Sequence, residues 1–399
     1  MDESRHVIVI SEDAMVYDDL ETLRQLPAFG QVLRDAAQVR TIRAVYPTLT
    51  YPIHTSLLTG CYPDAHGIGH NQPFQPDTAP NMRAWYWSAQ DIRVKTLHQA
   101  AQEKGLDVAS ILWPVSGKNR AVRRNFPEVL PLPGESAVKK MLQYASPLWI
   151  LRMELLYGKT RKSILQPDLD DYAALLCEKL YASSRPPQVL TVHLVDCDSM
   201  RHRYGVESPE AHAAMERLDR RVGRILNAVK RRGLWEDTLF CVVSDHGQQD
   251  APHGVLLDRE IKAACGARAQ SLGMGAYIFG PDLALALRAL QEHREEWGIA
   301  HIYNQDELRA LHAPEQVRLA VDALPGHCFL DKPEETHGEH GFGLDCPQAR
   351  TLLWLAGPGI RRGERIERAR LVDIAPTLAH ALGLSLSQAQ GRVLSEAFD

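Results

Sequence analysis

Five acidic and imidazole side chains follow short apolar runs at widely separated points of this sequence. They are Asp13 in "VIVISED", Asp198 and His202 in "DCDSMRHRYG", and Asp245 and His246 in "VSDHG". Carboxylates and imidazoles that converge from separate segments are the usual ligands of Zn²⁺, and Mn²⁺ or Fe also accept them. Each phrase alone is a weak signal, because DxxxH spacing and capped SDHG turns also occur without a metal. Their joint presence predicts a site for divalent cations.

Two further phrases carry chemistry. "THGEHGFG" supplies His337 and His340 as additional imidazoles, and "YPTLTYPIHTSLLTG" holds Thr50 between Pro47 and Pro52 at the start of an apolar run. The bland interpretation makes Thr50 the N-cap of a helix. The alternative makes it a nucleophile aimed at an anionic group. We expect it to be both, with the two prolines fixing the direction of its hydroxyl.

The elements that must position these residues form an alternating pattern. Apolar runs at 6–10, 188–196 and 238–245 each end in acidic residues, and a long helix is expected over 208–232. Strands that alternate with helices predict a parallel sheet covered on both faces. Ligands of such sheets gather at the carboxyl ends of the strands, where the acidic residues lie. A helix is also expected at about 18–37.

The chain of 399 residues is longer than one hydrophobic core usually supports. We therefore expect a metal-binding core with two insertions. The predicted core comprises residues 1–125, 166–265 and 337–399. The predicted insertions are a lid-like segment, 126–165, and an inserted subdomain, 266–336.

Composition excludes several classes of protein. A net charge of −5 and a pI near 6.4 argue against a binder of nucleic-acid polymers. The most apolar stretch, 141–158, is interrupted by Pro147, Arg152 and Glu154 and predicts an amphipathic helix or lid instead of a membrane span, so no membrane partner is expected. Seven cysteines without CxxC spacing, and a first segment without a secretory signal, favour reduced thiols in the cytoplasm. The oligomeric state stays open.

Taken together, these phrases resemble the alkaline phosphatase superfamily, and within it the nucleotide pyrophosphatase/phosphodiesterase family. The resemblance is carried by "VIVISEDAM", "VYPTLTYPIHTSLLTGCYPDAHGIGHN", "ILWPVSG", "DCDSMRHRYG", "VSDHG" and the late "HGFG". It covers roughly residues 1–120, 185–255 and 337–385. It implies an α/β fold with an alkaline-phosphatase-like core, a mostly parallel sheet sandwiched by helices, and inserted cap or lid segments.

The resemblance also implies a role for each matching residue. Thr50 is the implied nucleophile and contacts one metal, and Asn71 of "HGIGHN" is the implied oxyanion contact. The remaining residues are implied metal ligands: Asp13, Asp245 and His246 for the first ion, and Asp198, His202 and His340 for the second, with His337 as the alternative to His340. Glu12 and Ala14 depart from the family pattern without being ligands.

The implied activity is two-metal hydrolysis of phosphodiester or pyrophosphate bonds through a phosphothreonine, with a small phosphate ester or nucleotide as substrate. A phosphonate or phosphomonoester hydrolase with the same site is the alternative. A sulfatase is disfavoured, because Thr50 cannot become the aldehyde that a Cys or Ser would supply. A non-catalytic binding protein is disfavoured by the complete inferred ligand set. His54 and His193 are expected to be structural, and Asp196 to orient a ligand imidazole.

Overall fold

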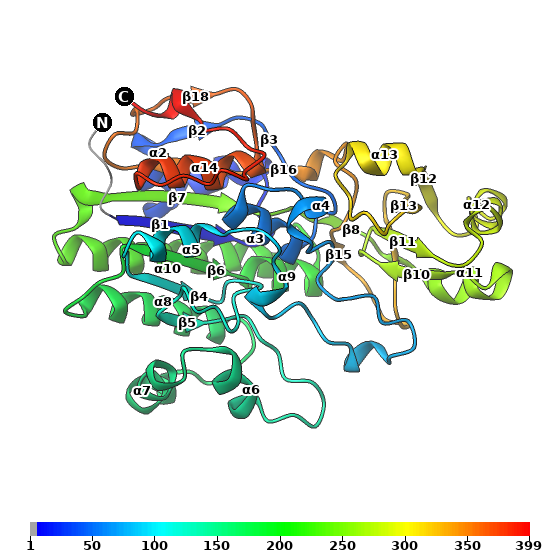
Figure 1. Ribbon diagram of the computed structural model, residues 1–399, viewed down its shortest axis with the longest axis horizontal. Helices are drawn as coiled ribbons and strands as arrows, with labels where there is room; N and C mark the ends of the chain where they lie inside the picture. The colour runs from blue at the N-terminus through cyan, green and yellow to red at the C-terminus, as the bar shows by residue number, and fades with distance from the viewer. Residues whose placement is uncertain (1–5) are drawn as a thin grey trace.

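The computed structural model describes residues 6–399, and its centre is an eight-stranded sheet with the order β18-β2-β17-β7-β1-β6-β4-β5 (Figure 1). The five strands from β7 to β5 are parallel, and β17 is antiparallel to β7 and to β2. All residues of β1, β6 and β7 are buried, which is why these strands are continuous apolar runs in the sequence. The strands are β1 (His6–Glu12), β2 (Ala37–Val39), β4 (Val108–Ile111), β5 (Arg124–Phe126), β6 (Val189–Leu194), β7 (Thr238–Ser244), β17 (Leu353–Ala356) and β18 (Arg365–Ile366).

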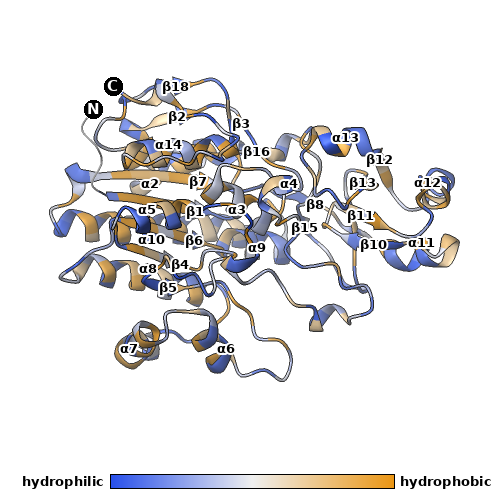
Figure 2. Cartoon of the chain, viewed as in Figure 1, coloured by the Kyte–Doolittle hydropathy of each residue, from blue (hydrophilic) through white to orange (hydrophobic). Residues whose placement is uncertain are grey.

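Helices cover both faces of this sheet, as predicted. On one face lie α1 (Leu20–Gln25), α2 (Pro27–Asp35), α8 (Asp168–Ala182) and α10 (Pro209–Arg231), and on the other lie α3 (Thr50–Thr59), α5 (Leu97–Glu103) and α14 (Ile374–Ala381). Figure 2 shows the strands between these layers mostly in the hydrophobic colour. The mixed α/β fold expected from the sequence is confirmed.

The helices match their predicted positions with one exception. The long helix expected over 208–232 is α10. The single helix expected at 18–37 is instead two helices, α1 and α2, separated by Leu26 in an extended conformation. Pro27 explains the break, because a proline disfavours the helical conformation of the residue before it.

A second, antiparallel sheet lies beside the core and has the order β10-β11-β13-β12. Helix α11 packs on it although the predicted inserted subdomain begins later, at residue 266. Tyr46, the first residue of the Thr50 phrase, contacts Tyr277 of this sheet with ring centroids 6.1 Å apart. The elements are β10 (Arg268–Ser271), β11 (Gly275–Phe279), β12 (Ile299–Tyr303), β13 (Ala320–Ala323), α11 (Leu257–Cys265), α12 (Leu283–Glu292) and α13 (Gln305–Ala310).

The predicted lid-like segment carries α6 (Ala137–Tyr144) and α7 (Pro147–Tyr157), beyond the edge strand β5. Only its first residues approach the Thr50 phrase, where Val129 packs in one cluster with Tyr51. Among residues 6–399, no helix has the length and apolar character needed to cross a bilayer. Short elements complete the chain: α4 (Pro63–His66), α9 (Asp196–Tyr204), β3 (Ile42–Arg43), β8 (Gln249–Asp250), β9 (His253–Val255), β14 (His327–Phe329), β15 (Gly338–Glu339), β16 (Arg350–Thr351) and β19 (Ala369–Arg370).

Candidate active site

Strand register brings the first group of predicted ligands together. β1 and β7 are parallel neighbours that pair Glu12 with Ser244, so the next residue of each strand, Asp13 and Asp245, emerges at the same edge. The Nε2 atom of His246 lies 3.6 Å from Asp13 Oδ1 and 3.3 Å from Asp245 Oδ2. One ligand atom from each of these three side chains lies within 4.8 Å of the ligand atoms of the other two. This is the spacing that a single cation requires.

The second group adjoins the first. Asp198 and His202 lie one turn apart on α9, with 3.3 Å between Asp198 Oδ1 and His202 Nε2. The ring of His340 stacks on that of His246 at a centroid distance of 3.9 Å, and ligand atoms of Asp198, His246 and His340 lie within 4.8 Å of one another. His337, the alternative late ligand, is 40% exposed and faces Glu335. The geometry therefore favours His340.

Backbone carbonyl groups hold two of the imidazoles in one tautomer. His202 Nδ1 donates to the carbonyl oxygen of Gly338 at 2.8 Å, and His340 Nδ1 donates to that of Thr48 at 3.1 Å. A carbonyl only accepts, so a proton stays on Nδ1 and Nε2 is the atom left to face a metal. Burial alone lowers the pKa of His202, but Asp198 and Glu339 outweigh burial and raise this pKa well above its usual range, so His202 must lose its Nε2 proton when a cation binds. Burial also lowers the pKa of His246 and His340 to about 4, so both rings are neutral at neutral pH. Neutral imidazole is the form that binds metal ions.

Burial shifts the pKa values of the carboxyl groups in the opposite direction, upward. Burial raises the pKa of Asp13 well above its usual range, and the charges of Asp198 and Asp245 raise it further. Burial likewise raises the pKa of Asp245 to about 6. Among the described residues, neither Asp13 Oδ1 nor Asp245 Oδ2 has a hydrogen-bond donor although both atoms are buried. Unpartnered buried oxygens next to imidazole Nε2 atoms are a donor set that fits a divalent cation.

Thr50 begins α3 at the border of the two groups. Its Oγ1 atom lies 3.2 Å from His246 Nε2, and the residue is only 9% exposed. The N-cap of α3 is Leu49, and no side chain caps this helix, so the expectation that Thr50 is also a cap is wrong. The hydroxyl is therefore not engaged by the helix backbone. Tyr51 N–H donates to Asn71 Oδ1 at 3.0 Å, which leaves the Asn71 NH₂ group to donate to a ligand beside Thr50.

Two residues that support Asp13 were not recognised from the sequence as parts of the site. His193 Nε2 lies 3.0 Å from Asp13 Oδ2, and His193 Nδ1 lies 3.2 Å from Glu128 Oε2. Burial alone lowers the pKa of His193, but its bonds to these two carboxylates outweigh burial and raise the pKa well above its usual range. A protonated imidazole between two carboxylates fixes the rotamer of Asp13. His193 comes from β6, and its contact with the distant Glu128 has no signal in local spacing.

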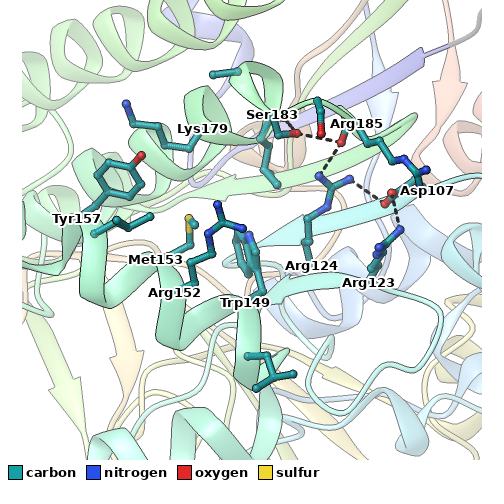
Figure 3. Close-up of a pocket in the computed structure, with 15 residues that line it drawn as sticks. Asp107, Arg123, Arg124, Trp149, Arg152, Met153, Tyr157, Lys179, Ser183 and Arg185 are labelled. Atoms are coloured by element: carbon teal, nitrogen blue, oxygen red, sulfur yellow. Dashed lines mark hydrogen bonds and ion pairs between the residues drawn. The ribbon is translucent and has the colours of Figure 1, made fainter.

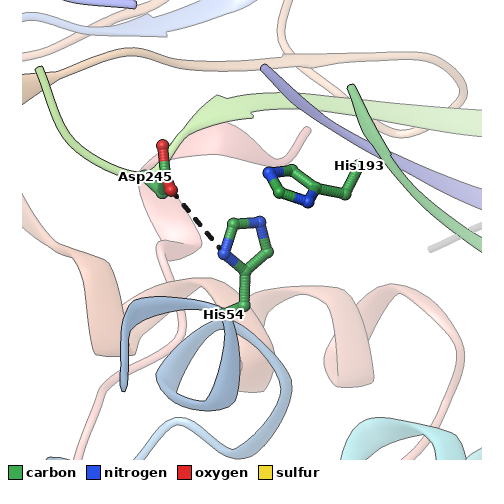
Figure 4. Close-up of side chains that lie close together, drawn as sticks. All are labelled: His54, His193 and Asp245. Atoms are coloured by element: carbon green, nitrogen blue, oxygen red, sulfur yellow. Dashed lines mark ion pairs between the residues drawn. The ribbon is translucent and has the colours of Figure 1, made fainter. Parts of the chain in front are cut away.

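His54, His193 and Asp245 form a third compact group of ligand-type side chains (Figure 4). Both nitrogens of His54 are already engaged, because Nδ1 donates to the carbonyl oxygen of Thr50 at 2.8 Å and Nε2 lies 2.9 Å from Ser11 Oγ. Both nitrogens of His193 are engaged as well. These imidazoles therefore brace the ligands and the nucleophile instead of forming another ion site.

The structure also corrects the expectation for Asp196. This residue is the first of α9, and its carboxylate binds Arg217 at 2.7 Å and Arg221 at 2.6 Å instead of a ligand imidazole. A different side chain, Gln248, donates from Nε2 to Asp198 Oδ1. The sequence analysis assigned Asp196 to the preceding strand, but β6 ends at Leu194 and Asp196 already belongs to α9.

Comparison with known proteins agrees with this arrangement. The family described as Type I phosphodiesterase / nucleotide pyrophosphatase matches residues 7–342. This chain belongs to that family. Members of the phosphodiesterase family act as hydrolases of phosphoric ester or anhydride bonds, and the chain is an enzyme of this class.

Individual relatives are distant. Bovine (Bos taurus) bis(5'-adenosyl)-triphosphatase ENPP4 is 22% identical over 95% of this chain and 78% of its own length. Ectonucleotide pyrophosphatase/phosphodiesterase family member 3 of Rattus norvegicus is 27% identical over 60% of this chain, and the match spans 24% of that relative. Murine ectonucleotide pyrophosphatase/phosphodiesterase 5 has the same fold, with a TM-score of 0.76 over 99% of this chain and 100% of the solved one at 19% identity. A second structure of the murine protein is an inactive threonine-to-alanine variant in complex with AMP.

Proposed function

We propose that this protein hydrolyses phosphodiester or pyrophosphate bonds of nucleotide-type substrates through a phosphothreonine formed at Thr50. The observation that carries the proposal is the position of Thr50 Oγ1, 3.2 Å from His246 Nε2 and beside both groups of ligand-type side chains. Asp13, Asp245 and His246 would hold one divalent cation, and Asp198, His202 and His340 a second. We propose Zn²⁺ for both. Such a pair supplies positive charge that stabilises an alkoxide nucleophile and the leaving oxygen.

The protein's own groups account for the remaining chemistry. The Thr50 hydroxyl group loses its proton to solvent and its oxygen attacks phosphorus. The bond from phosphorus to the leaving oxygen breaks, the leaving group departs and takes up a proton where it needs one, and the phosphoryl group is transferred to Thr50 with its remaining substituent. The Asn71 NH₂ group, whose amide is held in place by Tyr51 N–H, would donate to a nonbridging oxygen and stabilise its charge. Water then attacks the phosphothreonine, which releases the phosphorylated product and restores the hydroxyl group.

Substrate class is inferred from the relatives. The name of the bovine relative specifies bis(5'-adenosyl)-triphosphate, and the murine structure holds AMP, so a nucleotide is the favoured substrate here. A phosphomonoester or phosphonate would use the same nucleophile and ligands. For both of these substrates we expect a lower kcat/KM than for a nucleotide diester or pyrophosphate.

A single substitution with a matched control tests the nucleophile. Thr50→Ala should lower the turnover of chromogenic phosphodiester, phosphomonoester and phosphonate substrates by at least about 10³-fold, a loss typical of a missing catalytic nucleophile. Metal content per chain should stay unchanged. The control is Thr59→Ala at the other end of α3, whose hydroxyl bonds only within its own segment. Unchanged turnover in Thr50→Ala would exclude the mechanism.

We further propose a cytoplasmic, reducing location. All seven cysteines are unpaired, and five of them are buried. Fractionation of the source cells, followed by detection of the protein with an antibody, tests this proposal. Recovery of the protein outside the cytoplasmic fraction would contradict it.

A further inference from the structure

Helix α7 presents a row of leucines outward. Leu148, Leu151 and Leu155 are 83%, 50% and 85% exposed, and their spacing places them along one side of the helix. The other side buries Ile150 and Met153 in the core. Figure 2 shows hydrophobic colour on α7 although the helix lies at the periphery of the molecule. A contiguous exposed apolar row of this kind marks an interaction surface more often than chance exposure does.

A basic pocket adjoins this row. It has a volume of about 640 Å³ and lies between α7, the end of α8 and the starts of β4 and β5 (Figure 3). Leu148 belongs both to the row and to the wall of the pocket. Within residues 6–399, one acidic residue, Asp107, and five cationic side chains line the pocket: the cations are Arg123, Arg124, Arg152, Lys179 and Arg185.

Much of this positive charge is not neutralised. Asp107 is shared by Arg124, at 2.8 Å, and Arg123, at 3.5 Å. Within residues 6–399, the guanidinium groups of Arg152 and Arg185 have no hydrogen-bond or ion-pair partner. The pocket therefore attracts an anion, and guanidinium groups bind phosphate in preference to smaller or softer anions.

The pocket is separate from the metal site. Asp107 immediately precedes β4 and Arg124 begins β5, so the pocket lies at the amino ends of the parallel strands. The ligand-type side chains lie at the carboxyl ends. A group bound beside α7 therefore does not reach Thr50 through the sheet.

We propose that the leucine row of α7 and the basic pocket together form a docking surface for an anionic phospholipid bilayer. The leucines enter the boundary between headgroups and acyl chains, and a lipid phosphate occupies the pocket. Helix α7 itself supplies one cation, Arg152, and neighbouring elements supply the others. An apolar helix face beside basic side chains is the combination that binds to an anionic membrane surface. Trp149, half-buried in the pocket wall, is a residue type enriched at that depth.

Charge favours a membrane over a second copy of this chain as the occupant. Residues 135–165 carry six basic and two acidic side chains, whereas the whole chain has a net charge of −5. Two copies that paired through α7 would bring Arg152 and Arg185 of each close to those of the other, which costs free energy. An anionic surface attracts the same cations. The expectation of no membrane partner rested on the lack of a spanning segment, and surface docking needs none.

Vesicle flotation with the full-length protein tests the proposal. The protein should float with vesicles of phosphatidylcholine and phosphatidylglycerol, stay behind with phosphatidylcholine alone, and dissociate at high salt. L148S/L155S and R152E/R185E should each weaken binding at least tenfold. Leu285→Ser on α12 and Arg362→Glu are matched exposed controls that should bind as the wild type does. Hydrolysis of a soluble ester should be equal in all variants, which verifies folding.

Three results would overturn the proposal. One is equal binding of the wild type to anionic and neutral vesicles, or binding of L148S/L155S and R152E/R185E to anionic vesicles that equals that of the wild type. Another is self-association in sedimentation velocity that L148S/L155S abolishes, since the surface would then pair two copies. The third is binding of glycerol phosphate that R152E/R185E abolishes while no variant or wild type binds vesicles, since the pocket would then serve a soluble anion.

Discussion

His193 holds Asp13 from behind, and this contact has a measurable consequence. We expect His193→Phe to weaken metal binding about 10–100-fold, the usual effect of removing a hydrogen-bond partner of a metal ligand. Competition with a chromogenic chelator measures the affinity directly. His98→Phe is the matched control, because His98 is equally buried but bonds to Thr191. An affinity unchanged by the His193 substitution would show that Asp13 keeps its position without this partner.

Asn71 offers a second test at the scale of one residue. Removal of its amide in Asn71→Ala should lower kcat about 10²–10³-fold, because one donor to the developing charge is lost. Metal content should not change, since the amide is not a ligand in the proposed site. Steady-state kinetics together with metal analysis measure both quantities. A rise in KM with kcat unchanged would assign Asn71 to substrate binding alone.

Glu12 predicts a pH dependence of stability. Burial raises the pKa of this carboxyl group to about 8, with Asp170 adding to the effect and Arg221 opposing it. Between pH 4.5 and 8 the folded chain thus holds a proton that the unfolded chain releases, so the free energy of unfolding falls as pH rises through that window. Glutamine does not titrate, so the Glu12→Gln variant lacks this loss. For each pH unit of increase within the window, its free energy of unfolding should rise by about 1 kcal/mol relative to that of the wild type.

Urea unfolding of chelator-treated protein at several pH values between 5 and 8 measures this difference. Comparison of slopes removes any constant cost of a buried glutamine. Parallel curves for wild type and variant would contradict the raised pKa.

At the scale of elements, α9 is held by charges beneath it. Asp170 of α8 accepts the backbone N–H groups of Val195 and Asp196 at 2.8 and 2.9 Å, and Arg221 of α10 binds Asp196. Arg221 is only 1% exposed. These contacts fix the helix that carries the proposed ligands Asp198 and His202.

Breaking this support should destabilise the fold. Arg221→Leu removes the cation beside buried Asp170 and one of the two cations that bind Asp196, and it should lower the free energy of unfolding by about 3–5 kcal/mol. Arg220→Leu is the control, because Arg220 is the neighbour of Arg221 in sequence but is exposed and forms only a loose ion pair with Glu216. This substitution should lower the free energy of unfolding by less than about 1 kcal/mol. Denaturant unfolding compares the two. A similar loss of stability in both variants would show that the buried ion pairs of Arg221 contribute no more to the free energy of unfolding than the exposed pair of Arg220 does.

The same elements show what sequence reasoning can and cannot find. Asp13 and Asp245 were predictable, because fully buried parallel strands leave continuous apolar runs and their ends meet at one edge. Asp196 was not, because local spacing does not show where β6 ends and α9 begins. The link from His193 to Glu128 joins β6 to a segment that resembles no known motif. Such contacts depend on packing between elements, and one sequence does not contain that information.

At the scale of the whole molecule, three aspartates that lie close together, Asp13, Asp198 and Asp245, make stability depend on cations. Removal of metal by a chelator should lower the temperature of unfolding, since a ligand present at a thousandfold its Kd stabilises the folded state by about 4 kcal/mol. Zn²⁺ or Mn²⁺ should restore it. Differential scanning calorimetry measures the shift, and an unchanged transition would contradict the proposed ligand set.

Metal binding should also release protons. Burial raises the pKa of Asp245 to about 6 and that of Asp13 well above its usual range, so a cation displaces protons from them at acidic pH. Affinity should therefore rise as pH increases from 5 to 7. Titration calorimetry in two buffers with different ionisation enthalpies counts the protons released. Identical heats in both buffers would contradict the prediction.

The order of strands has a consequence for synthesis on the ribosome. Within the described residues 6–399, β2 pairs only with β17 and β18, and the proposed ligand His340 lies before both of these strands in the chain. A nascent chain that ends before residue 340 therefore has an early strand without neighbours and an incomplete set of donors for the second cation. Synthesis must therefore pass residue 366 before β2 has both of its neighbours, and by then the last proposed ligand has also been made.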